Sequence, residues 1–178
     1  MFLRGILCAS LAALSWPALA QSQSEASTPA PSCTVFDASL PDAFTGWRTK
    51  TNLQTADGRR SLQGTGIVPG VTYDLALLPT PAVTYVRQPE KPGGSVSYGG
   101  MLSLIVARAG TYVVALDGGA WIDVLRGHDP IVSTSHGRGP SCSTIRKMVE
   151  FPLSPGRYTI QIAASGTPRL AILIAQKP

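Results

Sequence analysis

The stretch Thr111-Tyr-Val-Val-Ala-Leu-Asp-Gly-Gly-Ala-Trp-Ile-Asp-Val-Leu125 decides the fold class of this chain. Its first six residues are rich in Tyr and Val, which favour β-strands. Asp117-Gly118-Gly119 follows and carries the Asp-Gly signal of a hairpin turn. From residue 120 to 125 an apolar face alternates with a face that carries Trp121 and Asp123. The stretch therefore predicts two strands joined by a tight turn.

Similar strand signals recur along the chain, and Gly or Pro interrupts each of them. They lie at residues 71–77, 83–86, 101–107, 144–151, 157–162 and 170–175. Strands that repeat every 8–12 residues or so are typical of a sandwich or barrel. We therefore predict an all-β fold. It is an antiparallel β-sandwich, jelly-roll-like, with about eight or nine strands.

The composition favours the same fold class. Gly (18) and Pro (15) are abundant among the 178 residues, which excludes collagen, a coiled coil and a helical bundle. Charged residues make up 14% of the chain, and no segment carries an apolar stripe long enough for a stable helix. The length fits one domain.

The first residues have the three parts of a secretory signal peptide. Arg4 is followed by an apolar run at residues 5–14, and Ala18-Leu19-Ala20 is a small-x-small cleavage signal. We expect residues 1–20 to be removed, residues 21–32 to be a disordered lead-in, and residues 33–178 to form a single β-sandwich domain. No later segment is apolar over about 18 residues, so we expect no membrane span and a periplasmic or secreted location.

Two cysteines, Cys33 and Cys142, follow the signal peptide. An exported chain folds in an oxidising compartment, so we predict a disulfide bond between them. The formal net charge is +5, but the basic residues are scattered along the chain. A nucleic-acid surface needs a dense basic stripe with stacking aromatics, so we expect no nucleic-acid partner.

Two pairs of residues are candidates for ligand binding. Trp121 and Asp123 could hold a sugar, because an aromatic plane covers its apolar face while a carboxylate accepts its hydroxyls. The alternative for Trp121 is a position in the core. His136 and Arg138 lie in a Gly- and Pro-rich loop and could bind an anion. The alternative is that this loop only exposes its charges to water.

Enzymatic chemistry has weaker support in the sequence. His128, His136 and Glu150 could be arranged as a two-His, one-carboxylate iron site. Serine hydrolase chemistry lacks a Gly-x-Ser-x-Gly elbow. We assign no catalytic residue, no metal ligand and no cofactor.

Five segments in chain order resemble a known family. They are Pro92–Gly100, Ala109–Tyr112, Gly119–Val124, His136–Cys142 and Ile145–Phe151. Together they are similar to an uncharacterised family of small exported bacterial β-sandwich proteins, some of which carry the label homogentisate 1,2-dioxygenase. That label implies a much larger cupin enzyme whose iron is held by two His and a Glu. This chain has Arg138 where a second loop His is expected, so the resemblance implies fold and export but no catalytic residue.

The sequence thus predicts an exported non-catalytic envelope protein with a binding or accessory role. Its expected partner is a small acid, a glycan or an envelope protein, contacted near Trp121, Asp123, His136 and Arg138. The alternative function is a metal-dependent dioxygenase-like enzyme that uses His128, His136 and Glu150.

Overall fold

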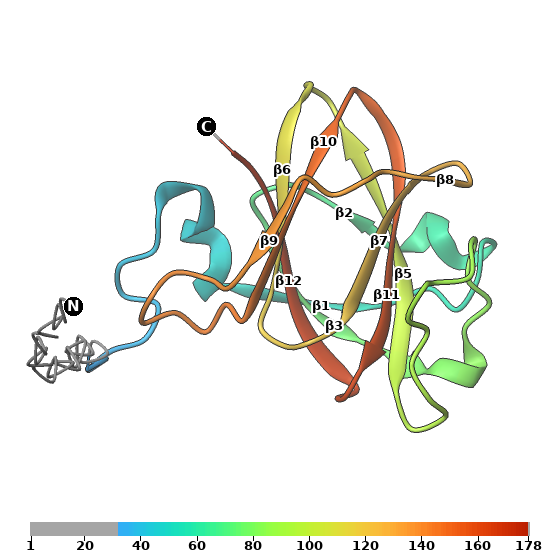
Figure 1. Ribbon diagram of the computed structural model, residues 1–178, viewed down its shortest axis with the longest axis horizontal. Coiled ribbons are helices and arrows are strands. Elements are labelled where there is room, and N and C mark those ends of the chain that lie inside the picture. Colours follow the sequence, from blue (N-terminus) through green and yellow to red (C-terminus); the bar gives the residue numbers. More distant parts are fainter. Residues whose placement is uncertain (1–31, 178) are drawn as a thin grey trace, which may run out of the picture. The chain divides into compact units, whose positions relative to one another are not determined.

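The computed structural model describes residues 32–177, in which strands predominate (Figure 1). The expected signal peptide, and the expected lead-in apart from Ser32, lie outside the described residues. The elements in chain order are η1 (Asp42–Arg48), β1 (Lys50–Gln54), η2 (Ser61–Gly64), β2 (Gly66–Ile67), β3 (Thr72–Ala76), β4 (Leu78–Pro79), η3 (Thr80–Ala82), β5 (Tyr98–Val106), β6 (Gly110–Leu116), β7 (Trp121–Arg126), β8 (Asp129–Pro130), β9 (Ser135–Gly137), β10 (Lys147–Leu153), β11 (Gly156–Ser165) and β12 (Arg169–Gln176), where η denotes a 3-10 helix.

Eight of these strands pair like one long hairpin that has been folded over on itself. β3 pairs with β12, β5 with β11, β6 with β10, and β7 with β8, all antiparallel. Antiparallel pairing of β12 with β6 and of β11 with β7 then completes two sheets. Their orders are β3-β12-β6-β10 and β5-β11-β7-β8. This nested order is that of a jelly roll, which confirms the predicted sandwich.

Short strands extend both sheets and correct the prediction in two respects. β1 joins β3, and β2 joins β5, in parallel, so the sheets are mixed and not purely antiparallel. The described strands number twelve, because β9 adds to β10 and β4 adds to β5. β2, β4 and β8 have two residues each and β9 has three, which is too few for a periodic pattern to reveal.

The core lies between the two sheets and consists of the inward residues of each strand. Ile122 and Val124 of β7 and Tyr158, Ile160 and Ile162 of β11 belong to it, as their alternation predicts. Tyr158 and Tyr112 enter the core with their hydroxyls satisfied, since each donates to a backbone carbonyl four residues away. Burial of these apolar faces is the main driving force that holds the sheets together.

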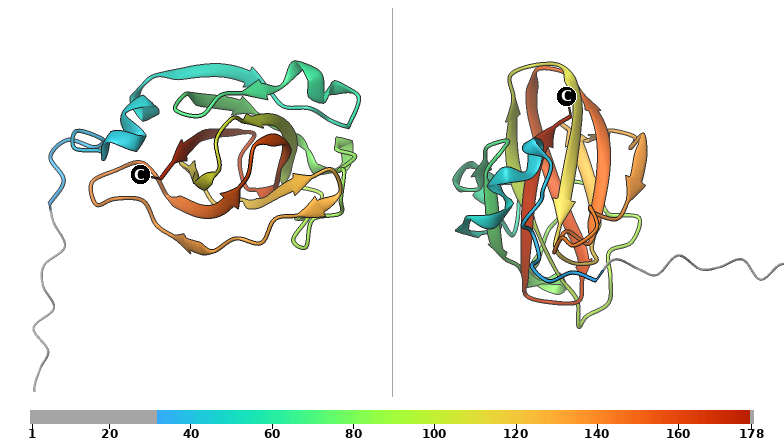
Figure 2. Two further views of the ribbon diagram at one scale, coloured as in Figure 1. Left: turned by 90° about the horizontal axis from the view of Figure 1, so that it is seen from above. Right: turned by 90° about the vertical axis from the view of Figure 1, so that its left-hand side faces the viewer.

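Both sheets are also covered on part of their outer faces. η1 packs on the sheet that contains β12, where Phe44 and Trp47 contact a buried outer row that includes Ala171 and Leu173 (Figures 1 and 2). This cover explains why residues 170–175 are buried on both faces of β12. Residues 80–97 lie on the outer face of the other sheet, where Tyr85 and Arg87 form hydrogen bonds with Ile162 and Gln161 of β11.

Two local predictions were wrong. Asp117-Gly118-Gly119 does not form a hairpin, because it connects β6 in one sheet to β7 in the other. Residues 83–86 do not form a strand. Prolines 79, 81 and 89 flank this segment and interrupt ladder pairing. The segment is held by single hydrogen bonds instead: the Thr84 N–H donates to the carbonyl of Asp57, and the Tyr85 hydroxyl donates to the carbonyl of Ile162.

The predicted disulfide bond between Cys33 and Cys142 is present, with the two Cα atoms 5.3 Å apart at a sequence separation of 109. The carboxylate of Asp37 reinforces this junction by accepting hydrogen bonds from the backbone N–H and the hydroxyl of Thr144, at 2.7 and 2.6 Å. The segment before η1 is thereby fixed to the loop before β10. No helix among residues 32–177 has the length and apolar character that crossing a membrane requires.

Candidate binding groove on the outer face of one sheet

Pairing of β5 with β11 places polar side chains on the outer face of their sheet. Ser103 lies opposite Thr159, and Ile105 lies opposite Arg157. The residues between them in each strand, such as Leu104 and Tyr158, point into the core. Because adjacent residues of a strand face opposite sides, Ser103, Ile105, Arg157 and Thr159 form one outward row.

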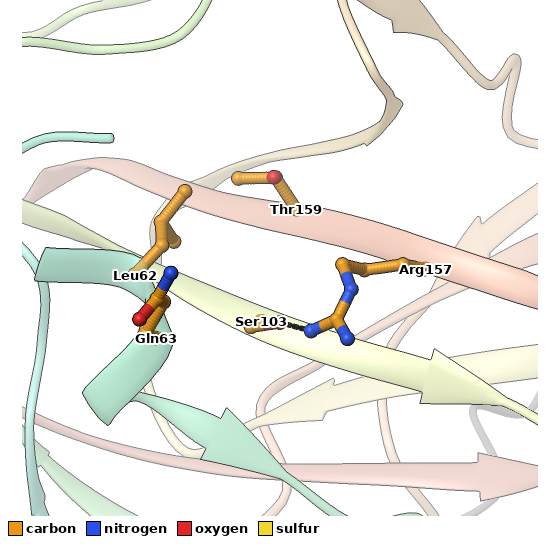
Figure 3. Close-up of a pocket in the computed structure, with 5 residues that line it drawn as sticks. All are labelled: Leu62, Gln63, Ser103, Arg157 and Thr159. Atoms are coloured by element: carbon orange, nitrogen blue, oxygen red, sulfur yellow. Dashed lines mark hydrogen bonds between the residues drawn. The ribbon is translucent and has the colours of Figure 1, made fainter. Parts of the chain in front are cut away.

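A groove lies over this outward row. Its central cavity has a volume of about 540 Å³ and is lined by Leu62, Gln63, Ser103, Arg157 and Thr159 (Figure 3). Leu62 and Gln63 come from η2, which forms the wall opposite the sheet. The groove thus lies between a short helix and the flat face of β5 and β11.

Adjoining cavities lengthen the groove in both directions. A cavity of about 300 Å³ shares Leu62, Arg157 and Thr159 with the central one and adds Arg59, Val86, Gly127 and Tyr158. A cavity of about 460 Å³ shares Gln63, Ser103 and Arg157 and adds Gly66, Ile67, Val68, Pro69 and Ile105. Arg157 lines all three and therefore stands at the middle of the groove.

The charged groups that line these three cavities are the guanidinium groups of Arg59 and Arg157. Within residues 32–177 neither of them forms a salt bridge with a carboxylate. Arg157 donates a long hydrogen bond of 3.4 Å to the Ser103 hydroxyl. Arg59 lies 2.6 Å from Nε2 of His128, and since a guanidinium only donates, this ring nitrogen must accept. The groove is therefore positively charged, and each guanidinium group has further N–H donors that could bind a ligand.

One wall of the groove is fixed by hydrogen bonds from the sheet. Val86 lines the groove and belongs to the covering segment, residues 80–97, which lies on the outer face of this sheet. Its neighbours Tyr85 and Arg87 are both hydrogen-bonded to β11. Gln161, which is fully buried, bonds both backbone polar groups of Arg87. Tyr85 donates its hydroxyl to the carbonyl of Ile162 at 2.9 Å. The cavity beside Val86 is therefore bounded by a segment with a defined position.

Asp123 lies beneath the same covering segment. Burial raises the pKa of its carboxyl, while hydrogen bonds from Trp121 at 2.9 Å and Gln161 at 3.4 Å, together with the charge of Arg87, act to lower it. The charge of Glu90 raises it further. Burial, and secondarily the charge of Asp123, raises the pKa of Tyr85 to about 12.

The four predicted ligand residues fall into two separate places. Trp121 and Asp123 are half-buried in β7, bonded to each other, and Lys91 lies 5.3 Å from the centroid of the Trp121 ring. His136 lies in β9, at the edge of the other sheet, and Arg138 follows it; both are exposed. Within the described part of the chain no hydrogen bond or ion pair links the two pairs.

The three residues of the alternative iron site do not converge. His128 is held by Arg59 beside β7, whereas Glu150 in β10 accepts two hydrogen bonds from Lys177 at 3.0 and 3.1 Å. His136 pairs with Val149, so His136 and Glu150 point to opposite faces of their sheet. Among residues 32–177 no group of three His, Cys, Asp or Glu side chains could hold a metal ion.

Sequence reasoning did not single out the groove residues. The signal for Arg157 and Thr159 was the alternation of residues 157–162, in which the face opposite the core is polar throughout. The position of Arg59 and Gln63 depends on how η2 packs against a strand about forty residues later, and no local pattern reports that.

No protein-family model matches the chain, and no curated protein is significantly similar to it in sequence.

Proposed function

We propose that the protein is an exported, non-catalytic binding protein of the cell envelope that holds an anionic ligand in the groove over β5 and β11. One observation carries the proposal. Arg59 and Arg157 line the same cavity of about 300 Å³, and among the described residues no carboxylate shares that cavity. Two guanidinium groups without a protein counter-charge form an attractive site for a carboxylate, which accepts their paired N–H donors.

The remaining lining indicates which kind of anion fits. The hydroxyls of Ser103 and Thr159 and the amide of Gln63 can donate to and accept from hydroxyl groups of a ligand. Leu62 and Val86 offer apolar contact beside them. A carboxylate that also carries hydroxyls, such as a hydroxy acid or a uronic acid sugar, matches this mixture.

Two features support an envelope location. The Cys33–Cys142 bond fits an oxidising compartment outside the cytoplasm. Residues 1–20 have the pattern of a signal peptide.

Calorimetric titration of the purified, disulfide-bonded protein tests the proposal. The probes are galacturonate, citrate and, as the neutral control, galactose. We expect saturable binding of an acid that weakens as salt is added, and no binding of galactose. Arg157→Ala should weaken binding by about tenfold or more.

Arg146→Ala is the matched control. Arg146 is exposed, precedes β10 in the other sheet and does not line the groove. It removes the same charge from the molecule, so it should leave the affinity unchanged within about twofold. Equal losses in the two variants would mean that net charge, not the groove, attracts the acid. Absence of saturable binding to every acid would refute the proposal.

A further inference from the structure

We infer that the ligand is an extended chain of acidic sugar units rather than a single small acid. This inference rests on the proposed function and names the ligand class of the same groove. It follows from how far the groove continues on either side of the cavity that Arg59 and Arg157 share.

Beyond Arg59 the groove opens into a further cavity of about 430 Å³. Its lining is Asp57, Gly58, Arg59, Arg60, Ser61, Ala82 and Thr84. Asp57 accepts a hydrogen bond of 2.5 Å from the Ser61 hydroxyl, so part of its acceptor capacity is already used. Arg60 adds a second exposed guanidinium group next to that of Arg59. With two guanidinium groups and one carboxylate in its lining, this further cavity keeps a net positive charge.

Beyond Arg157, at the other end, the lining becomes apolar. Ile105 is 59% exposed and Val68 is 58% exposed, and both line the cavity of about 460 Å³ together with Pro69. Large exposed apolar side chains gathered in one hollow indicate a contact surface. The C–H faces of sugar rings are the part of an acidic glycan that would cover such a surface.

The four adjoining cavities, of about 430, 300, 540 and 460 Å³, offer more space than a single small acid fills. Neighbouring cavities share Arg59, then Arg157 with Thr159, then Arg157 with Ser103. Cationic side chains therefore recur along the groove, with hydroxyl groups between them. This arrangement matches a polymer whose carboxylates and hydroxyls also recur along its length.

A glycan fits the groove better than an acidic peptide does. An extended peptide is usually bound by adding a strand to a sheet edge, where backbone groups are free to pair. The floor of the groove is the face of β5 and β11, whose facing backbone groups already pair with each other from Gly156–Val106 to Ile162–Gly100. The groove therefore offers side-chain donors and apolar contact, not a backbone ladder.

A length series of oligogalacturonates tests the inference by calorimetric titration of the disulfide-bonded protein. We expect the affinity to rise by about tenfold or more from the dimer to the hexamer, because the longer chain reaches both ends of the groove. A hexamer of neutral glucose units should bind at least about tenfold more weakly than the acidic hexamer.

Ile105→Ser tests the far end of the groove. The side chain is exposed, so the variant should fold, and it should weaken binding of the hexamer by about threefold or more while leaving the dimer unchanged. Val132→Ser is the matched control, since Val132 is 80% exposed and lies outside the groove.

The outcomes separate this inference from the proposed function. Binding of galacturonate that does not strengthen with chain length would overturn the chain ligand but leave the anion site intact. Equal binding of acidic and neutral hexamers would overturn both the anion site and the acidic character of the chain. Failure of the acidic hexamer and of every small acid to bind would refute both.

Discussion

The side-chain amide of Gln161 makes both hydrogen bonds of a strand pair with the backbone of Arg87. It accepts from the Arg87 N–H at 3.1 Å and donates to the Arg87 carbonyl at 2.9 Å. Gln161 is fully buried in β11, and Arg87 belongs to the segment that bounds the groove. This segment is not a strand and has no strand partner among the described residues. The Gln161 side chain therefore satisfies the backbone N–H and carbonyl of Arg87 in place of a neighbouring strand.

Gln161→Leu should release the covering segment. The substitution removes two hydrogen bonds to the backbone of Arg87 and the one to Asp123, and each such bond contributes about 0.5–1.5 kcal/mol net. We expect a loss of about 2 kcal/mol or more in the free energy of unfolding, measured by urea denaturation. Amide exchange at residues 84–88 should accelerate. Gln54→Leu, at an exposed glutamine of β1, is the control and should cost less than about 1 kcal/mol.

Gly99→Ala should disturb the same segment from the sheet side. A Cβ atom at residue 99 would lie 2.0 Å from the Tyr85 hydroxyl oxygen and 2.5 Å from the carbonyl oxygen of Ile162. These two atoms form a hydrogen bond, which the added methyl group would break. We expect a loss of about 1–3 kcal/mol in stability. Gly119→Ala meets no atom within 4 Å and should be tolerated. Similar unfolding midpoints for the two variants would contradict this account.

Tyr85 should make the stability fall at alkaline pH. Its pKa is raised from 10.0 to about 12, so the folded state holds the phenol proton more tightly than the unfolded state does. That contribution is complete below pH 10 and is lost as the pH rises through 12. Tyr85→Phe should therefore show a shallower loss of stability over this interval. The check is urea denaturation across it, with tyrosinate absorbance recorded in parallel.

Asp123 should also make the stability fall as the pH rises, but in the acidic range. Burial raises the pKa of its carboxyl in the folded state, so protonation favours folding. Its contribution is complete below the unfolded pKa of about 4 and is lost as the pH rises through the folded pKa. Asp123→Asn keeps an acceptor for Trp121 and removes the titration. Relative to this variant, the unsubstituted protein should gain stability between neutral pH and pH ~4, and a constant difference would count against the assignment.

Removal of the disulfide bond should weaken the fold without abolishing it. Replacing Cys33 and Cys142 by Ala frees a loop of 109 residues, and loss of a native disulfide typically costs about 2–5 kcal/mol. The bonds of Asp37 to Thr144 and of Trp47 to Thr144 remain. We expect a lower midpoint of thermal unfolding with unchanged far-UV circular dichroism. An unchanged midpoint in the double variant would show that these bonds alone suffice.

Much of the fold could be predicted because alternation reports which face of a strand is buried. Residues 157–162 and 120–125 show this, since their apolar residues lie in the core as expected. Turn chemistry is less informative, because Asp117-Gly118 marks a change of direction but not the sheet in which the next strand lies. The two-residue strand β2, which pairs with β5 in parallel, depends on tertiary contacts and leaves no periodic signal.

The site was harder to predict for a related reason. Trp121 and Asp123 do lie on the outer face of β7, but a segment that begins some forty residues earlier covers that face. Arg59 and Arg157 are nearly a hundred residues apart in the sequence and line one cavity because η2 packs against β5, the strand that pairs with β11. Such convergence follows from topology, which residue spacing does not encode.

The last strand of the fold, β12, lies between β3 and β6 inside its sheet. Until residues 169–176 have been synthesised, β3 and β6 have no strand between them and that half of the sandwich cannot close. Closure of this sheet must therefore wait for residues 169–176, as is general for folds dominated by contacts between distant residues. This order fits the proposed export in an extended state, because the sandwich cannot close before residues 169–176 are present.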